Sequence, residues 1–202
     1  GQFFLSASLD KSVKLWNTES GECLNRWILD SMAFLVRFVT DQEFLVATGD
    51  NCIYLYSSQL NNAMKSEEPI RHFKGHTKPI NCITLLSTAH FITTSDDKTC
   101  RIWDLQNGKT IRFISNSSSV GSLSHCILHP SFPTNGQIAI QSSKNKILTY
   151  KTDGITNNFH LSLSNKSFFG YRLNGYACGI AFSPNGTFIA TGDGDGNLVI
   201  WE

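Results

Sequence analysis

Short runs of β-branched and aromatic residues recur along the chain, and each run ends in an aromatic side chain. The five aromatic residues stand at positions 16, 56, 103, 150 and 201, so the spacings between them are 40, 47, 47 and 51 residues. Apolar and polar residues alternate in these runs, and turn-forming residues bound them, which is typical of short β-strands. A period of ~40–45 residues built from such strands indicates a β-propeller with four strands in each blade.

The unit at 69–104 shows the expected order of strands most clearly. An outer strand is expected near 70–74, an inner strand at 80–86, a second strand at 90–95, and a third strand, which ends in Trp103, at 100–104. In the other units, the second strand is expected at 3–8, 43–48, 137–142 and 187–192. Polar stretches at 57–68, 115–119 and 153–167 are interpreted as insertions at the outer edge.

We therefore predict an all-β fold in which residues 1–202 form one propeller segment of about four and a half blades. Its repeat units end near 17, 57, 104, 151 and 202. Because propellers close into rings of ~4–8 blades, we expect further blades and a seven-bladed ring.

Four residues of the best unit have the spacing of a hydrogen-bonded chain: His76, Ser95, Asp97 and Trp103. We expect the Trp103 indole to donate to Ser95 and the Ser95 hydroxyl to donate to His76. His76 then donates to Asp97. Because an unpaired buried polar group costs ~1–3 kcal/mol, this chain would fix the turn after the second strand against the loop before the inner strand.

The same residue types, His, Ser and Asp, also form hydrolase triads. The sequence has no G-x-S-x-G segment, so we interpret the four residues as structural. The Asp193-Gly-Asp195 segment resembles the start of a calcium loop, but its place between two strands predicts a turn. We predict no metal site and no cofactor.

These repeats resemble the WD40 family. Four segments resemble, more narrowly, the WD-repeat pre-mRNA-splicing factors of the second catalytic step: FLSASLDKSVKLWNTESGECLNRW (4–27), TTSDDKTCRIWD (93–104), NGYACGIAFSPNG (174–186) and TGDGDGNLVIW (191–201). The resemblance spans nearly the whole chain in register. It implies a nuclear, non-catalytic scaffold of the spliceosome that assists exon ligation. Its implied partners are spliceosomal proteins, and an snRNA or pre-mRNA backbone, with no small-molecule substrate and no membrane.

Two other classes of function stay open, because the WD40 signature specifies a fold rather than an activity. The protein could be a WD40 adaptor in another complex, such as a ubiquitin ligase or a chromatin complex. A hydrolase that uses His76, Ser95 and Asp97 is the third class.

Composition and net charge exclude few classes of protein. The chain is 41% hydrophobic and 16% charged, which is enough for a core and too little charge for a disordered chain. With 17 basic and 16 acidic residues the net charge is +1, so no overall field marks a nucleic-acid binder. The charge is uneven, however, because 105–192 has one acidic residue, Asp153, against seven basic ones: Lys109, Arg112, Lys144, Lys146, Lys151, Lys166 and Arg172.

Four further positions are candidates for binding a partner: Lys11, Lys78, Lys98 and Lys144. In propellers of this type, the turns after the second strands and the loops before the inner strands share one rim. We therefore expect these lysines on one side, where they would bind an acidic protein segment or an RNA backbone.

Overall fold

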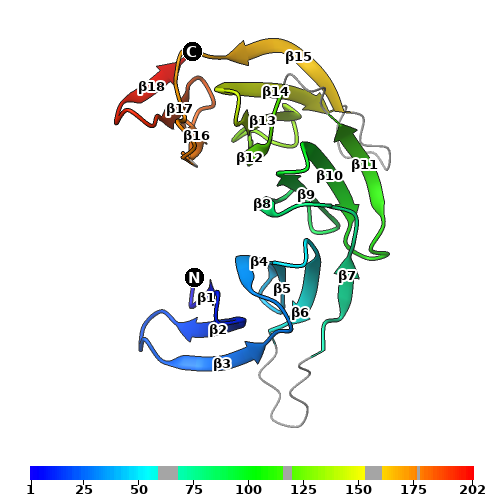
Figure 1. Ribbon diagram of the computed structural model, residues 1–202. Helices are drawn as coiled ribbons and strands as arrows, with labels where there is room; N and C mark the ends of the chain where they lie inside the picture. The colour runs from blue at the N-terminus through cyan, green and yellow to red at the C-terminus, as the bar shows by residue number, and fades with distance from the viewer. Residues whose placement is uncertain (59–67, 116–119, 153–160, 177) are drawn as a thin grey trace.

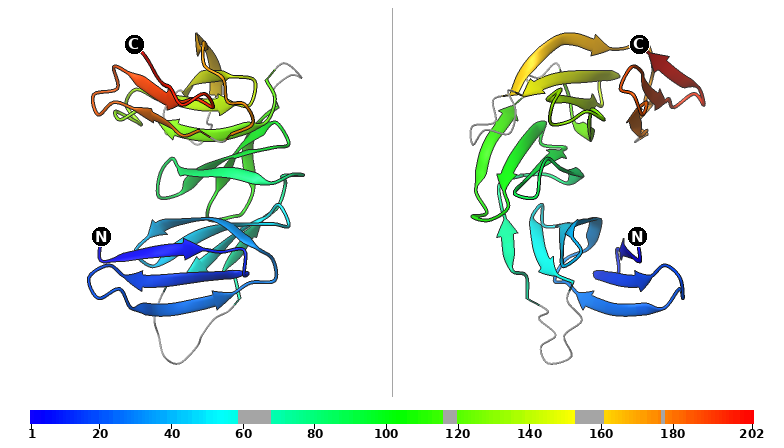
Figure 2. Two further views of the ribbon diagram at one scale, coloured as in Figure 1. Left: turned by 60° about the vertical axis from the view of Figure 1, so that its left-hand side comes forward. Right: turned by 180° about the vertical axis from the view of Figure 1, so that it is seen from behind.

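The structure is a computed structural model that describes residues 1–58, 68–115, 120–152, 161–176 and 178–202. In these ranges the chain forms strands and turns, with five antiparallel sheets arranged side by side along an open arc (Figure 1). A view turned by 60° and a view from behind show the sheets arranged like blades, with the two chain ends on the open side of the arc (Figure 2). No helix among the described residues is long and apolar enough to cross a membrane.

Three sheets have four strands, and the two sheets at the ends of the arc have three. The first sheet contains β1 (Phe3–Ala7), β2 (Ser12–Asn17) and β3 (Cys23–Ile28). The second contains β4 (Ala33–Thr40), β5 (Glu43–Thr48), β6 (Ile53–Ser57) and β7 (Arg71–Phe73). The third contains β8 (Ile80–Leu85), β9 (His90–Ser95), β10 (Thr99–Asp104) and β11 (Thr110–Ser115). The fourth contains β12 (Leu123–Leu128), β13 (Gln137–Ser142), β14 (Lys146–Thr152) and β15 (Leu161–Phe168). The fifth contains β16 (Ile180–Phe182), β17 (Ile189–Gly192) and β18 (Leu198–Trp201).

The sequence repeat and the sheet are offset by one strand. The outer strand β7 begins the unit that contains β8, β9 and β10, yet it pairs with β6 of the preceding sheet. The Arg71 guanidinium of β7 also donates to the Leu105 carbonyl oxygen at 2.7 Å, in the turn that follows β10. This outer strand therefore links its own sheet to the next one along the chain.

The core lies between neighbouring sheets rather than within one sheet. The second strands β5, β9 and β13 are buried along almost their whole length, because sheets pack against both of their faces. Between the second and third sheets, Phe73 meets Phe91 edge-on with ring centroids 4.9 Å apart, and Phe91 stacks on Trp103. The aromatic residue at the end of the third strand is thus a packing anchor, which explains why it recurs along the chain.

The predicted insertion at 153–167 is wrong in its second half, because β15 (Leu161–Phe168) is the outer strand of the fourth sheet and pairs with β14. An outer strand packs on one side only, so its polar residues concealed it in the sequence. The first part of this stretch lies outside the described residues, as do most of the predicted insertions at 57–68 and 115–119.

Candidate functional site

A chain of three buried hydrogen bonds connects the third sheet to the loop that enters it. The Trp103 indole N–H of β10 donates to the Thr93 hydroxyl of β9 at 2.8 Å. The same hydroxyl oxygen lies 2.7 Å from His76 Nε2, and His76 Nδ1 lies 2.8 Å from a carboxylate oxygen of Asp97. The structure therefore brings together three of the four residues expected in this chain, His76, Asp97 and Trp103.

The prediction that Ser95 supplies this hydroxyl is wrong, because the Thr93 hydroxyl lies between Trp103 and His76 instead. Strand pairing sets Trp103 opposite Phe91, so the indole reaches two residues along β9 and not four. The Ser95 hydroxyl instead donates to the Lys78 carbonyl at 3.0 Å and accepts from the Asp97 backbone N–H. Ser95 thus connects the turn after β9 to the loop before β8, but it is not part of the hydrogen-bonded chain from Trp103 to Asp97.

The first sheet shows a signal that could have found the right hydroxyl. There, the Trp16 indole donates to the Ser6 hydroxyl at 2.9 Å. In both sheets the hydroxyl residue precedes the tryptophan by ten positions. The predicted hydroxyl residue, Ser95, precedes the tryptophan by eight positions, where Ser or Thr also recurs along the sequence.

The charge states in the chain follow from burial and hydrogen bonding. Burial lowers the pKa of His76 and outweighs the opposite effect of the Asp97 carboxylate, so His76 is neutral near pH 7. Burial alone would raise the pKa of Asp97, but hydrogen bonds from Thr99 and His76 outweigh it and hold that pKa below its usual value. A neutral His76 donates from Nδ1 to ionised Asp97 and accepts at Nε2 from Thr93.

This arrangement suits a structural role and not nucleophilic catalysis. The Thr93 side chain is fully buried, and its oxygen already accepts a hydrogen bond from Trp103. A substrate therefore has no access to the hydroxyl in this conformation.

In the other sheets, different side-chain hydrogen bonds hold the equivalent turn in place of this hydrogen-bonded chain of side chains. In the second sheet, the Tyr54 hydroxyl donates to Asp50 at 2.7 Å. In the fifth, the Asn174 amide donates to Asp195 at 2.7 Å. Lys144 stands at the equivalent place in the fourth sheet. The residues that hold the turn thus vary from sheet to sheet.

Backbone hydrogen bonds show that these turns and loops form one edge of the arc, which we name the turn rim. It consists of the turns after β1, β5, β9, β13 and β17 together with the loops before β4, β8, β12 and β16. Turn and loop are joined by Gly49 N–H to Met32 O, Asp96 N–H to Pro79 O, Ser143 N–H to Ser122 O, and Gly194 N–H to Arg172 O, at 2.9, 3.0, 2.8 and 2.6 Å.

The four lysines proposed to bind a partner all lie on the turn rim and are all exposed. Lys11 and Lys98 occupy the left-handed backbone position of their turns, with φ of 64° and 67°. The equivalent positions in the other sheets carry the residues that tolerate this conformation best, Asn51, Asn145 and Gly196.

The rim is not uniformly basic. Lys11 follows Asp10, which lies 3.9 Å from Arg26, and Lys98 follows Asp97. Hydrogen bonds from Ser12 and Ser8 lower the pKa of Asp10, so this carboxylate stays charged beside Lys11. The Asp97 side chain is bound to His76 and only 5% exposed, so the aspartates that the rim presents together with the lysines are Asp10, Asp50 and Asp195.

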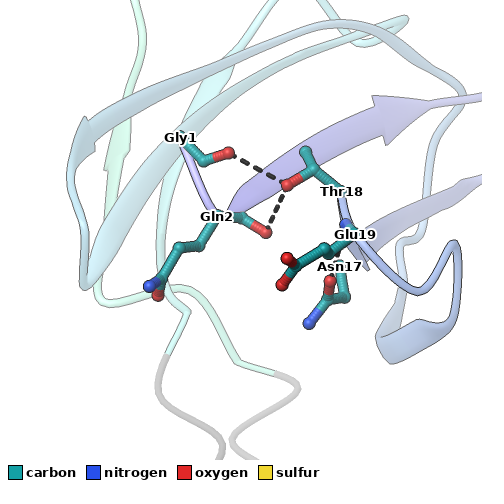
Figure 3. A pocket seen from close by; sticks show the side chains of 5 residues that line it. All are labelled: Gly1, Gln2, Asn17, Thr18 and Glu19. Atoms are coloured by element: carbon teal, nitrogen blue, oxygen red, sulfur yellow. Dashed lines mark hydrogen bonds between the residues drawn. The ribbon is translucent and has the colours of Figure 1, made fainter.

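A shallow pocket lies outside the turn rim, at the start of the chain (Figure 3). The Thr18 hydroxyl bridges the carbonyl oxygens of Gly1 and Gln2, and Asn17 and Glu19 complete the lining. Glu19 is its one charged side chain. Among the described residues, no three His, Cys, Asp or Glu side chains lie close enough together to hold a metal ion.

Comparison with protein families identifies the repeats. The model of the "WD domain, G-beta repeat" matches residues 1–17, 67–104 and 166–202. In the crystal structure of the WD40 β-propeller domain of Doa1, 60% of that chain superposes on all of this one with a TM-score of 0.76 and 20% sequence identity. This similarity establishes the fold alone.

Two relatives are similar along the whole chain, and a third is similar along about half of it. Pre-mRNA-processing factor 17 of Homo sapiens is 32% identical over 208 residues, which cover 100% of this chain and 33% of that protein. Pre-mRNA-processing factor 17 of Saccharomyces cerevisiae is 29% identical over 204 residues, and 42% of it is covered. The guanine nucleotide-binding protein subunit beta of the same yeast is 35% identical over 111 residues, but over only 54% of this chain. The chain thus spans about a third of the length of the human relative.

Proposed function

Since this chain carries WD40 repeats and folds as a segment of a WD40 β-propeller, we propose that its protein is a nuclear, non-catalytic scaffold of the spliceosome that assists exon ligation. One observation carries the proposal, namely the similarity to pre-mRNA-processing factor 17 over 100% of the chain in both human and yeast. The similarity to the yeast guanine nucleotide-binding protein subunit beta covers only about half of the chain, as expected for a shared fold.

The proposal of a scaffold rather than an enzyme is supported by the chemistry of the buried chain. The hydrogen bond between His76 and Asp97 positions a turn. The Thr93 hydroxyl next to His76 is buried and is already bonded to the Trp103 indole. These polar groups stabilise the turn rim, and a stable rim is what a docking protein requires.

The lysines of the turn rim are the proposed contacts with a partner. Lys11, Lys78, Lys98 and Lys144 are exposed, come from three of the sheets and share one edge of the arc. Because the exposed aspartates Asp10, Asp50 and Asp195 share the rim with them, the rim suits a protein segment of complementary mixed charge, with acidic residues opposite the lysines.

Depletion of the protein from a splicing extract of its own organism tests the function. We expect the free 5′ exon and the lariat intermediate to accumulate, because exon ligation is the step that the scaffold assists. Adding back the purified full-length protein should restore the ligated exons, and a mock-depleted extract is the control. Normal exon ligation after complete depletion, as for a ubiquitin-ligase or chromatin adaptor, would overturn the proposal.

A further inference from the structure

Two large apolar side chains are exposed where the turn rim crosses the second sheet. Met32 lies in the loop before β4, and Phe34 lies near the start of β4, the inner strand of this sheet (Figure 1). Each of the two residues is 42% exposed. A Cβ atom at Gly49, in the turn after β5, would lie 3.4 Å from the Phe34 ring and 3.7 Å from the Met32 Cε atom. Both side chains therefore cover the same glycine and form one apolar surface.

The third and fourth sheets carry polar residues at the place of Phe34. The backbone hydrogen bonds of the turn rim align Phe34 with Asn81 and Ser124. The Asn81 amide donates to Asp96 in the turn after β9 at 2.7 Å, and the Ser124 hydroxyl donates to the Gln141 side chain of β13 at 2.8 Å. A phenylalanine ring cannot hold its sheet by such bonds. The second sheet therefore differs from its neighbours by an exposed aromatic ring on the rim.

Two carboxylates flank this apolar surface. Asp30 lies in the loop before β4 and Asp50 in the turn after β5, and both are exposed. Among the described residues, no cation forms an ion pair with either of them. Burial alone would raise the pKa of Asp50, but hydrogen bonds from Thr48 and Tyr54 outweigh it and lower that pKa, so Asp50 is charged near pH 7. We name these four residues the Phe34 corner: Asp30, Met32, Phe34 and Asp50.

The exposed charges of the rim change sign from the second sheet to the third. On the third sheet, whose inner strand β8 lies next to β4 in Figure 1, Lys78 and Lys98 are exposed. The two aspartates of that turn, Asp96 and Asp97, are less exposed and are bonded to side chains of their own sheet. A chain segment that crosses from the second sheet to the third thus meets an apolar, acidic surface first and lysines second.

This order of groups suits one kind of partner. Aromatic and methionine side chains are enriched in protein–protein interfaces, where they contact apolar side chains of the partner. Carboxylates beside such a surface attract Lys or Arg and so set the direction in which the partner lies. A phosphate backbone would be repelled by the two carboxylates, and it has no apolar side chain to place on Met32 and Phe34.

We propose that the Phe34 corner docks a protein segment in which an apolar side chain stands next to Lys or Arg. The apolar side chain lies on Met32 and Phe34, and the cation lies at Asp30 and Asp50. Acidic residues farther along the same segment reach the lysines of the third sheet. The inference rests on the proposed role as a scaffold and specifies the chemistry of the partner at one part of the turn rim.

The test selects ligands from a random library of 12-residue peptides displayed on phage, with the purified full-length protein as the target. Before each round, the library is depleted on the double variant Met32→Ser, Phe34→Asn. These replacements are the residues at the equivalent positions of the fourth and third sheets, Ser122 and Asn81, so the variant should fold. Circular dichroism verifies the fold. The selected peptides should share an apolar residue next to Lys or Arg.

The affinity of the selected peptides, labelled with fluorescein, is then measured by anisotropy. We expect Phe34→Asn to weaken binding about 10-fold, as for a residue at the centre of an interface. Asp30→Lys should weaken binding at low salt, and its effect should shrink as the salt concentration rises, because the charge is exposed.

The matched control is Phe113→Asn. Phe113 is an aromatic residue of the outer strand β11 that is 60% exposed, and its ring lies 5.5 Å from the Arg101 guanidinium. It is outside the Phe34 corner, so Phe113→Asn should bind the selected peptides as the wild type does.

Three results would overturn the proposal: no enrichment of peptides on the wild type over the double variant, selected peptides that lack Lys and Arg, or equal losses of affinity in Phe34→Asn and Phe113→Asn. Because the assay contains no splicing extract, these results would leave the proposed splicing function untouched. Conversely, normal exon ligation after depletion would overturn the splicing function but leave the peptide affinities as measured.

Discussion

The indole N–H of Trp103 donates a 2.8 Å hydrogen bond to the hydroxyl of Thr93, and both side chains are almost completely buried. Thr93 in turn is the link between Trp103 and His76 in this chain. One hydroxyl therefore couples the packing anchor of the third sheet to the loop of the turn rim.

Thr93→Val removes this link while keeping the volume of the side chain. It leaves the Trp103 N–H and His76 Nε2 buried without partners, so we expect a loss of ~1–3 kcal/mol in the free energy of unfolding. Thr93→Ser keeps the hydroxyl and should cost much less. The measurement is urea denaturation of the full-length protein and its two variants.

The first sheet supplies the control for this prediction. The Trp16–Ser6 bond is of similar length but lies in a partly exposed site. The Ser6 hydroxyl is bonded to Trp16 alone, whereas that of Thr93 is bonded to both Trp103 and His76, so Ser6→Ala should cost less than Thr93→Val. Equal stability of Thr93→Val and the wild type would show that the hydroxyl contributes nothing to the rim.

The strand pattern was readable because each third strand ends in an aromatic anchor, and the spacing of those anchors already indicated the positions of the second strands. The outer strand β15 escaped notice because one-sided packing permits its polar residues. The choice between Thr93 and Ser95 was also beyond the sequence pattern. Both residues point to the same side of β9, and only the pairing of Trp103 with Phe91 decides between them.

The candidate surfaces can be predicted from the sequence to different degrees. The lysines of the turn rim could be placed from turn positions alone. The sequence shows the positive charge of 105–192, but the register of the strands decides on which face of its sheet each of these cations lies. The contact of Arg101 with Phe113 depends on the register of β10 and β11, which short-range patterns do not determine.

The titration of His76 predicts how stability depends on pH. Burial lowers its pKa in the folded protein below the ordinary value of about 6.5, so below that pH the unfolded chain binds more protons. The stabilising contribution of neutral His76 is therefore complete above pH ~6.5 and is lost as the pH falls below it. Asp97 adds a second loss, but only below its ordinary pKa of 3.8, because its folded pKa is also lowered.

Melting temperatures between about pH 7 and pH 5 avoid the ordinary pKa range of carboxyl groups, and the comparison with His76→Gln removes the contributions that the two proteins share. The wild type should lose stability on acidification, and His76→Gln, which cannot titrate, should lose less. If both proteins show the same decrease in melting temperature, His76 does not have the lowered pKa.

Gly136 and Gly21 form a matched pair for backbone strain. Both have positive φ, 60° and 70°, so alanine at either position costs ~1–2 kcal/mol. At Gly136 the new Cβ would also meet the Thr152 carbonyl oxygen at less than van der Waals distance, whereas nothing lies within 4 Å at Gly21. We expect Gly136→Ala to lower the melting temperature more than Gly21→Ala, and equal decreases would contradict the close approach of Thr152.

The turn rim is tested by changing Lys11, Lys78, Lys98 and Lys144 together to Glu in the full-length protein. Reversing these charges should slow association with the particle about 10-fold or more at low salt, and the bound protein should wash off at lower salt than the wild type. Lys14→Glu, which is outside the rim, is the control. Wild-type retention of the fourfold variant at every salt concentration would show that another surface docks the protein.

The central claim, that the protein works inside the spliceosome, is tested most directly by sequencing the RNA that co-purifies with an affinity-tagged full-length protein from nuclear extract. The account predicts strong enrichment of spliceosomal snRNAs together with lariat intermediates, since the scaffold is proposed to be present when the exons are joined. Recovery of the protein with ubiquitin-ligase or chromatin subunits, and without enrichment of snRNAs over an untagged control, would contradict it.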